Sequence, residues 1–213
     1  MTLVALASKD CPLCPRLVAF REQNKIKHPD YYNGAVAAFS APQVKMLIVG
    51  LAPGLHGANA TGRPFTADYA GDLLYPTLIK YGFAQGEYLE RADDGLELVD
   101  CRITNAVRCV PPENKPLPDE IKICNQFLKT EIASLQKDLR VILTLGLIAH
   151  QATLRALDIK QSTFKFAHGK EHQVGNFIIL NSYHCSRYNT NTGRLTEAMF
   201  HAIFVTAREL CDE

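Results

Sequence analysis

The sequence has no excess of charge of either sign and no long apolar run. Lys and Arg total 23 against 22 Asp and Glu, giving a formal net charge of +1. This balance excludes a uniformly basic nucleic-acid-binding surface but allows a basic patch on one face. No apolar stretch is long enough to span a membrane, and the apolar residues 1–7 are too short and lack the charged start of a signal peptide. We therefore expect a soluble, intracellular, cytoplasmic protein without a membrane partner.

The glycine-rich stretch 50–72 lacks both familiar phosphate-binding patterns. Gly50, Gly54 and Gly57 miss the G-x-G-x-x-G spacing, and no Gly-Lys-Ser/Thr follows them. The stretch begins where the apolar run 45–49, which predicts a buried strand, comes to an end. Its small residues let the backbone approach a ligand closely. We therefore predict a ligand-binding loop at the carboxyl end of a strand, where open α/β sheets place their sites.

Strand-like and helix-like segments alternate along the rest of the chain. Apolar runs predict strands at 45–49, 96–105, 141–146 and 177–180. Apolar residues at helical spacing follow at 71–81, 118–135, 147–157 and 195–206. This alternation predicts an α/β fold, a three-layer α/β/α sandwich around a short, mainly four-stranded parallel sheet. With 213 residues and 47% hydrophobic content, we expect one domain spanning residues 1–213.

Seven cysteines in a reducing compartment favour ligation of a metal or cluster over a disulfide framework. Cys11 and Cys14 form a C-x-x-C turn ahead of a helical pattern, and Cys109 and Cys124 are separated by fourteen residues. Four cysteines complete the shell of a zinc ion or an iron-sulfur cluster, and spacing alone does not distinguish the two. Alternatively, Cys109 and Cys124 are buried small hydrophobic side chains.

Several polar and aromatic side chains follow the predicted strands and are candidates for chemistry. They are Phe65 and Asp68 after the first strand, Asn105 at the end of the second, and His184, Ser186 and Arg194 after the fourth. Each main candidate has a plainer alternative. Phe65 is then a core residue, Asp68 caps the following helix, and His184 is a hydrogen-bonded turn residue. The segment 161–175, with its histidines and lysines, is interpreted as a solvated, phosphate-facing loop rather than a metal site.

Taken together, these motifs resemble those of the uracil-DNA glycosylase superfamily, most closely its family 5 (type B) iron-sulfur enzymes. The first family motif is similar to Gly50-Leu51-Ala52-Pro53, Asn59, Thr61-Gly62-Arg63, Phe65-Thr66 and Asp68. The cluster motif resembles Cys11-Pro12-Leu13-Cys14-Pro15 with Cys109 and Cys124, and later family segments resemble 104–116 and 181–194. The likeness runs from Cys11 to Arg194.

The resemblance implies a monofunctional glycosylase that flips uracil out of DNA and hydrolyses the N-glycosidic bond. It implies a [4Fe-4S] cluster, rather than zinc, on an N-terminal cluster-binding segment and its partner cysteines Cys11, Cys14, Cys109 and Cys124. A monomer acting on single- or double-stranded uracil-containing DNA is expected. The expected catalytic residues are Asp68, which positions water or stabilises the cationic sugar, and His184, which donates to the departing uracil. The expected substrate-binding residues are Gly50, Leu51, Ala52, Pro53, Phe65, Asn105, Ser186 and Arg194.

The chain departs from the family pattern at a few positions. Cys185 replaces the usual proline, Leu51 stands where other members carry an acidic residue, and Asn105 is type A-like. Two other functions stay open on the sequence alone: a non-catalytic cluster-bearing DNA-binding protein, in which Ala60 and Cys185 mark lost activity, and a nucleotide or nucleoside hydrolase. Whether other deaminated bases such as hypoxanthine are removed also stays open.

Overall fold

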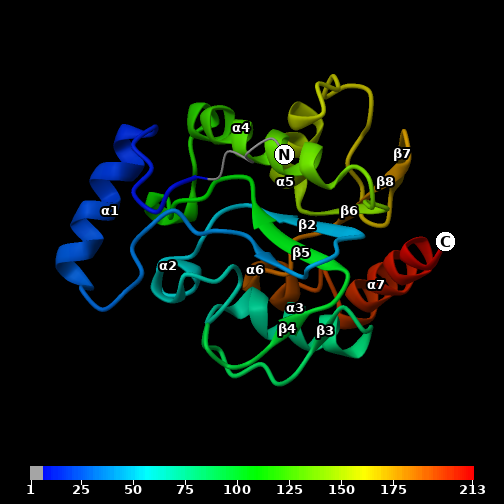
Figure 1. Cartoon of the computed structure of the whole chain (residues 1–213), viewed down its shortest axis with the longest axis horizontal. Helices are drawn as coiled ribbons and strands as arrows, with labels where there is room; N and C mark the ends of the chain where they lie inside the picture. The colour runs from blue at the N-terminus through cyan, green and yellow to red at the C-terminus, as the bar shows by residue number, and fades with distance from the viewer. Residues whose placement is uncertain (1–6) are drawn as a thin grey trace.

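One mixed sheet organises the computed structural model, which describes residues 7–213 (Figure 1). Within that range the sheet has six strands in the order β1-β5-β2-β6-β8-β7. Its four central strands are mutually parallel: β5 (Cys101–Asn105), β2 (Met46–Gly50), β6 (Val141–Leu145) and β8 (Phe177–Ser182). The predicted four-stranded parallel core is confirmed. The apolar start of the chain, residues 1–6, lies outside the described residues.

Antiparallel strands close both edges of this sheet. β1 (Phe39–Ser40) pairs with β5, and β7 (Glu171–Val174) pairs with β8 through a hairpin that turns at Gly175. The interpretation of 161–175 as a solvated loop is therefore wrong for its last third. His172 on β7 is buried, and its ring stacks on Phe164 with centroids 4.6 Å apart. The Gly-Asn pair after Val174 is a hairpin signal that accounts for the difference.

The single strand predicted at 96–105 is also wrong, because the chain turns in its middle. β4 (Glu97–Leu98) pairs with β3 (Ala84–Gln85) in a separate two-stranded ribbon, and β5 starts only at Cys101. Between them Asp100 has φ +55°, a left-handed conformation that Asp tolerates better than most residues. The run of apolar residues gave no sign of this turn.

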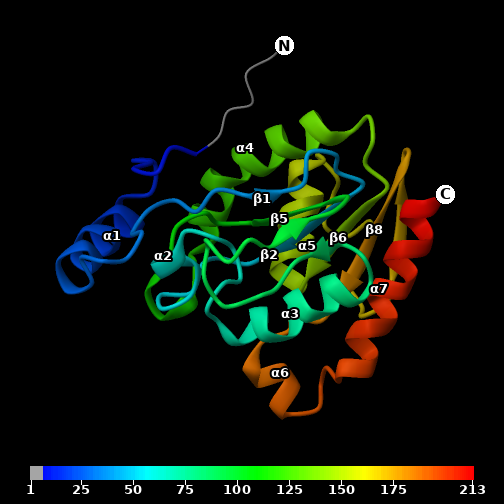
Figure 2. The same ribbon diagram turned by 60° about the horizontal axis from the view of Figure 1, so that its bottom comes forward.

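Helices cover both faces of the sheet (Figures 1 and 2). α4 (Pro118–Leu135) and α5 (Leu147–Ala156) lie on one face, and α3 (Tyr69–Lys80) and α7 (Glu197–Asp212) lie on the other. Alternate residues of β2 serve the two cores: Met46 and Ile48 pack with the α3 and α7 side, whereas Leu47 and Val49 pack with the α4 and α5 side. A strand buried on both faces reads as a continuous apolar run. The three-layer sandwich is confirmed.

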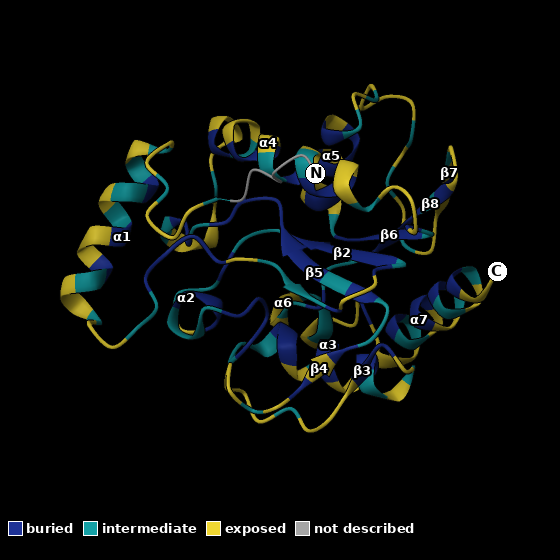
Figure 3. Cartoon of the chain, viewed as in Figure 1, coloured by how far each residue is buried: buried dark blue, intermediate teal, exposed yellow. Residues whose placement is uncertain are grey.

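α1 (Pro15–Lys27) lies at one end of the molecule, and much of its surface is exposed (Figure 3). Its inner side chain Leu17 packs against Val107 and Cys124. Arg16 donates two hydrogen bonds to Glu120, at 2.8 and 2.7 Å, and so joins α1 to the first turn of α4. Across residues 7–213, no helix has the length and apolar character needed to cross a membrane.

Candidate active site

A cavity of about 750 Å³ lies where the parallel strands end. It is lined by the segments that follow β2, β6 and β8, and by the start of α3. Six of the predicted residues line it: Leu51, Ala52, Asp68, His184, Ser186 and Arg194. This volume is within the range of small-molecule sites in proteins. The cavity is therefore the candidate active site, and it stands at the predicted edge of the sheet.

Asn105 and Phe65 are not on the cavity lining but pack together behind it, against Gly50. A Cβ added to Gly50 would meet Asn105 Oδ1 and would lie 2.6 Å from Phe65 Cζ, so only glycine fits between them. Asn105 is 4% exposed, and its Oδ1 is buried without a hydrogen-bond partner in residues 7–213. Within the described residues this amide oxygen therefore makes no hydrogen bond to the surrounding backbone, which is unusual for a buried polar atom. Pro53, also predicted to bind substrate, is not on the lining either.

His184 follows β8 and turns its imidazole toward Phe65. The two ring centroids are 6.1 Å apart and the planes are inclined by 29°. Its Nδ1 is buried, and no group in the described part of the chain hydrogen-bonds to that atom. Burial lowers the pKa of His184 to about 4, so the ring is neutral at physiological pH. A neutral imidazole has one N–H to donate. The turn itself is held by Asn189 Nδ2, which donates to His184 O at 2.8 Å, but no hydrogen bond to the imidazole supports the turn-histidine alternative within the described residues.

Asp68 begins α3 and also faces the cavity. Its Oδ1 accepts a hydrogen bond of 2.9 Å from Gly71 N, so the capping alternative describes a real contact. Burial raises the pKa of this carboxyl above its ordinary value, and the nearby Asp72 acts in the same direction. The close approach of Asp68 to Gly57 leaves no room for a side chain at that glycine. Capping and a role in chemistry are compatible, because capping engages only one of the two oxygens.

The turn after His184 is fastened to α3. The Cys185 side chain is fully buried, and its Sγ donates to Ala70 O at 3.6 Å, so the thiol fills the place of the family proline. Ser186 then caps the short helix α6 (Arg187–Asn191). Thr190 Oγ1 donates to Tyr69 Oη at 3.0 Å. The turn after His184 thus keeps a fixed position without the proline.

Some lining residues were missed by the sequence analysis. Leu147 and Ile148 begin α5 directly after β6, and both are exposed at the cavity. Phe166 and Tyr183 line it as well, and Arg194 lies over the Tyr183 ring at 4.7 Å. In the sequence, the one feature that could have indicated these residues was their position near the end of a predicted strand. That position does not show which side chains contact a ligand.

The four predicted cysteine ligands line one small apolar pocket enclosed by α1, the segment after β5, and α4. Cys124 Sγ accepts a hydrogen bond of 3.4 Å from Arg108 N. Burial raises the pKa of Cys109 to about 12 and that of Cys124 to about 11, so both remain thiols unless a cation is present. The described residues contain no group of three or more His, Cys, Asp or Glu side chains able to hold a single metal ion.

Comparison with known proteins identifies the family. Residues 37–208 match the family model of the uracil DNA glycosylase superfamily. The chain is 41% identical to the Type-5 uracil-DNA glycosylase of Thermus thermophilus, covering 94% of this chain and 93% of the relative. It is 35% identical to the Type-5 enzyme of Pyrobaculum aerophilum (88% and 83% covered) and 30% identical to the Type-4 enzyme of Sulfurisphaera tokodaii (84% and 77% covered).

The chain therefore belongs to the uracil-DNA glycosylase superfamily. The resemblance noted in the sequence is confirmed, both for the superfamily and for its type-5 members.

Proposed function

We propose that this protein excises uracil from DNA by hydrolysing the N-glycosidic bond, leaving an abasic site. The observation that carries the proposal is the meeting of Asp68 and His184 in one cavity, with Phe65 and Asn105 directly behind. The names of the type-5 relatives support the same reaction. Because the reacting atoms lie inside the duplex, the target nucleotide must rotate out of the base stack into this cavity.

Base recognition is assigned to Phe65 and Asn105. Phe65 is assigned to stacking on the base because its ring lies next to His184, a residue of the cavity lining, with the two ring planes inclined by 29°. The Asn105 amide has a donor and an acceptor side by side, which complements O4 and N3–H of uracil and mismatches cytosine. Its Oδ1 is buried and has no hydrogen-bond partner among residues 7–213. We assign this oxygen as the acceptor for N3–H of uracil.

Stabilisation of the departing uracil is assigned to His184. Negative charge grows on the uracil oxygen as the bond to the sugar breaks. The neutral imidazole of His184 has one N–H, which it donates to that oxygen. A preorganised donor of this kind is worth about 3 kcal/mol in the barrier.

Asp68 is assigned to the sugar side of the scissile bond. Its carboxylate lies at the cavity edge and keeps one oxygen free of the Gly71 contact. As a carboxylate it stabilises the positive charge that grows on the deoxyribose, or orients the attacking water.

We propose a [4Fe-4S] cluster on Cys11, Cys14, Cys109 and Cys124. The four cysteines line one pocket, and their four thiolates would complete the ligand shell of such a cluster. The similarity of their spacing to that of the iron-sulfur glycosylases favours the cluster over zinc. When bound, the cluster supplies structural cross-linking of α1 to α4 and to the segment after β5.

The proposed partner is uracil-containing DNA, bound by an intracellular monomer. The formal net charge of +1 requires the cationic contacts to be local, and Arg187 and Arg194 at the cavity supply them. Phosphate contacts of this kind position the strand without reading its sequence.

The decisive test uses one oligonucleotide that carries a single uracil, the same oligonucleotide with thymine, and free deoxyuridine. The proposal predicts abasic sites only in the first. Cleavage of free deoxyuridine at a comparable rate would instead indicate a nucleoside hydrolase, and binding without excision would indicate a non-catalytic DNA-binding protein. A His184→Ala preparation purified in parallel controls for contaminating glycosylase.

A further inference from the structure

The backbone around Phe65 adopts a conformation that needs outside support. Phe65 has φ +54° and Ala67 has φ +58°, both in the left-handed region that bulky or β-carbon-bearing residues avoid. The Phe65 carbonyl also lies against Gly71, where an added Cβ would clash with it. Such a conformation persists only where neighbouring groups determine it.

A stacked pair of tyrosines supplies part of that support. Tyr75 and Tyr88 lie with ring centroids 4.5 Å apart and planes at 25°. Tyr75 Oη donates to Pro64 O at 2.5 Å, and Tyr88 Oη donates to Phe65 O at 3.4 Å. Tyr88 Oη also accepts from Ala67 N at 3.2 Å. Burial raises the pKa of Tyr88 to about 12, so its hydroxyl keeps the proton that it donates.

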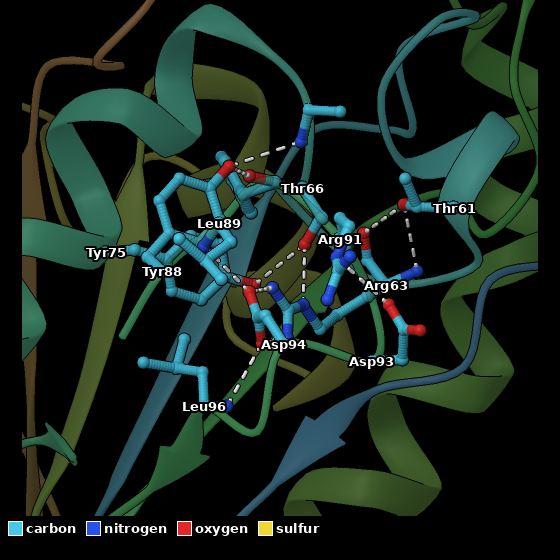
Figure 4. A network of polar contacts seen from close by, with 12 residues as sticks. Thr61, Arg63, Thr66, Tyr75, Tyr88, Leu89, Arg91, Asp93, Asp94 and Leu96 are labelled. Carbon is cyan, nitrogen blue, oxygen red and sulfur yellow. Dashed lines mark hydrogen bonds and ion pairs between the residues drawn. The ribbon is translucent and has the colours of Figure 1, made fainter. Parts of the chain in front are cut away.

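A buried ion pair supplies the rest (Figure 4). Arg63 donates two hydrogen bonds of 2.7 Å to Asp94, whose side chain is fully buried, and a third of 2.7 Å to Thr66 Oγ1. Asp94 also accepts from the backbone N–H groups of Leu89 and Leu96, at 3.1 and 3.0 Å. The carboxylate therefore joins the segment 89–96 to Arg63, and Arg63 in turn bonds Thr66 on the other side of Phe65.

Asp94 and Tyr88 belong to a segment without any recognised motif, and neither lines the cavity. Their contacts converge on residues 63–67 and reach the site only through that loop. We infer that Asp94 and Tyr88 are positioning residues that hold Phe65 in its left-handed conformation, so that its ring faces the extruded base. This inference rests on the proposed stacking role of Phe65.

The sharpest test removes only the Tyr88 hydroxyl. Tyr88→Phe keeps the stack on Tyr75 but loses the contacts to Phe65 O and Ala67 N, and we expect single-turnover excision to slow about tenfold. Affinity for uracil-free DNA should not change. Tyr81→Phe is the matched control, because the Tyr81 ring stacks near Phe204, away from residues 63–67, and its hydroxyl has no hydrogen bond within the described range. It should excise uracil at the wild-type rate.

A double-mutant cycle separates positioning from general structural damage. If Tyr88 acts through Phe65, the Tyr88→Phe change costs nothing further in a Phe65→Ala background. An equal tenfold loss in both backgrounds would overturn the inference. If Phe65→Ala alone excised uracil at the full rate, the proposed stacking role would fail and the inference with it. If Phe65→Ala were slow while Tyr88→Phe was not, the inference alone would fail.

Asp94→Asn tests the ion pair and is measured in the same way, alone and in the Phe65→Ala background. The amide keeps the shape of Asp94 but leaves the buried Arg63 charge without its partner, so we expect a larger rate loss than for Tyr88→Phe. Asp100→Asn is the control, since Asp100 pairs with Arg208 at 3.5 Å beside the amino end of β5, away from the cavity. If Asp94→Asn excised uracil at the wild-type rate, Asp94 would not be a positioning residue.

Discussion

The rings of Phe65 and His184 lie nearly parallel, with centroids 6.1 Å apart, although one follows β2 and the other follows β8. These strands are separated in the sheet by β6. Because all three are parallel, their carboxyl ends meet at one edge, and residues distant in sequence become neighbours there. The site is a consequence of strand direction, and each of its proposed roles is open to test.

The cluster is tested by the metal content of the purified protein. Protein isolated without oxygen should be brown and contain about four irons per chain, because four cysteines satisfy one cubane. Cys109→Ala or Cys124→Ala should impair folding and DNA binding before it affects chemistry. Cys211→Ala, on α7, is the control and should keep the iron. Stoichiometric zinc without iron would contradict the proposal.

His184 is tested by single-turnover kinetics. His184→Ala should slow excision by about a hundredfold or more, as expected for a lost donor to the developing anion, with a smaller effect on DNA affinity. His201→Gln on α7 serves as the control. Because the pKa of His184 is about 4, the wild-type rate should show no inflection near pH 6.5. An inflection there that disappears in His184→Ala would show that the ring titrates in the active enzyme.

Asp68 is tested by the pH dependence of excision. Its pKa is raised by burial, so the carboxylate protonates at a higher pH than an ordinary Asp, for which the value is about 3.9. The rate should therefore fall on the acid side beginning above that value. Asp68→Asn should be slow and should lose this decline. If Asp68→Asn kept the full rate, Asp68 would be a helix cap only, and the water would be positioned by another group.

Asn105 is tested by comparing two bases. Excision of uracil by Asn105→Ala should fall about tenfold or more, because the amide pairs with O4 and N3–H in a desolvated pocket. Excision of hypoxanthine in the same sequence context should fall less steeply. Equal losses on both bases would assign Asn105 a structural role alone.

Glu131 is tested by unfolding. This buried α4 residue pairs with Arg102 at 2.5 Å and with Arg108, and it accepts from Thr104 Oγ1 at 3.0 Å. Burial opposes ionisation, but the two arginines hold the pKa of Glu131 below its ordinary value. Glu131→Gln should therefore lower the free energy of unfolding by about 3 kcal/mol at pH 7.

The sign of the Glu131 effect with pH provides a check. A lowered pKa contributes stability above the ordinary value of 4.5, and that contribution is lost as pH falls through the folded-state pKa. The difference between wild type and Glu131→Gln in urea denaturation should thus shrink on acidification. Exposed Glu209→Gln is the control, with little expected change. A difference that grew at low pH would contradict the assignment.

The parallel strands were predictable from sequence because burial on both faces leaves an uninterrupted apolar run, as in β2. The edge strand β7 was missed, since its residues alternate weakly and only the Gly-Asn turn marks it. The turn at Asp100 could not be predicted from the hydrophobic pattern of residues 96–105. Local pattern therefore identified the central sheet better than its margins.

The candidate site divides in a similar way. Asp68 and His184 were predictable because each stands shortly after a strand and in a recognisable motif. Asp94 was not predictable, because its inferred positioning role depends on an ion pair with Arg63, which is distant in sequence. No local sequence pattern indicates that pair. The burial of Asn105 behind the cavity likewise depends on its packing against Gly50, which only the folded chain reveals.

The strand order has a consequence for synthesis of the chain. β2 pairs with β5 on one side, but its other edge stays open until β6 has been made, and His184 enters only after β8. A nascent chain released before Val141 would therefore present the unpaired edge of an entirely apolar strand, which is a template for aggregation. Uracil excision therefore requires synthesis of the chain through β8, because His184 follows that strand.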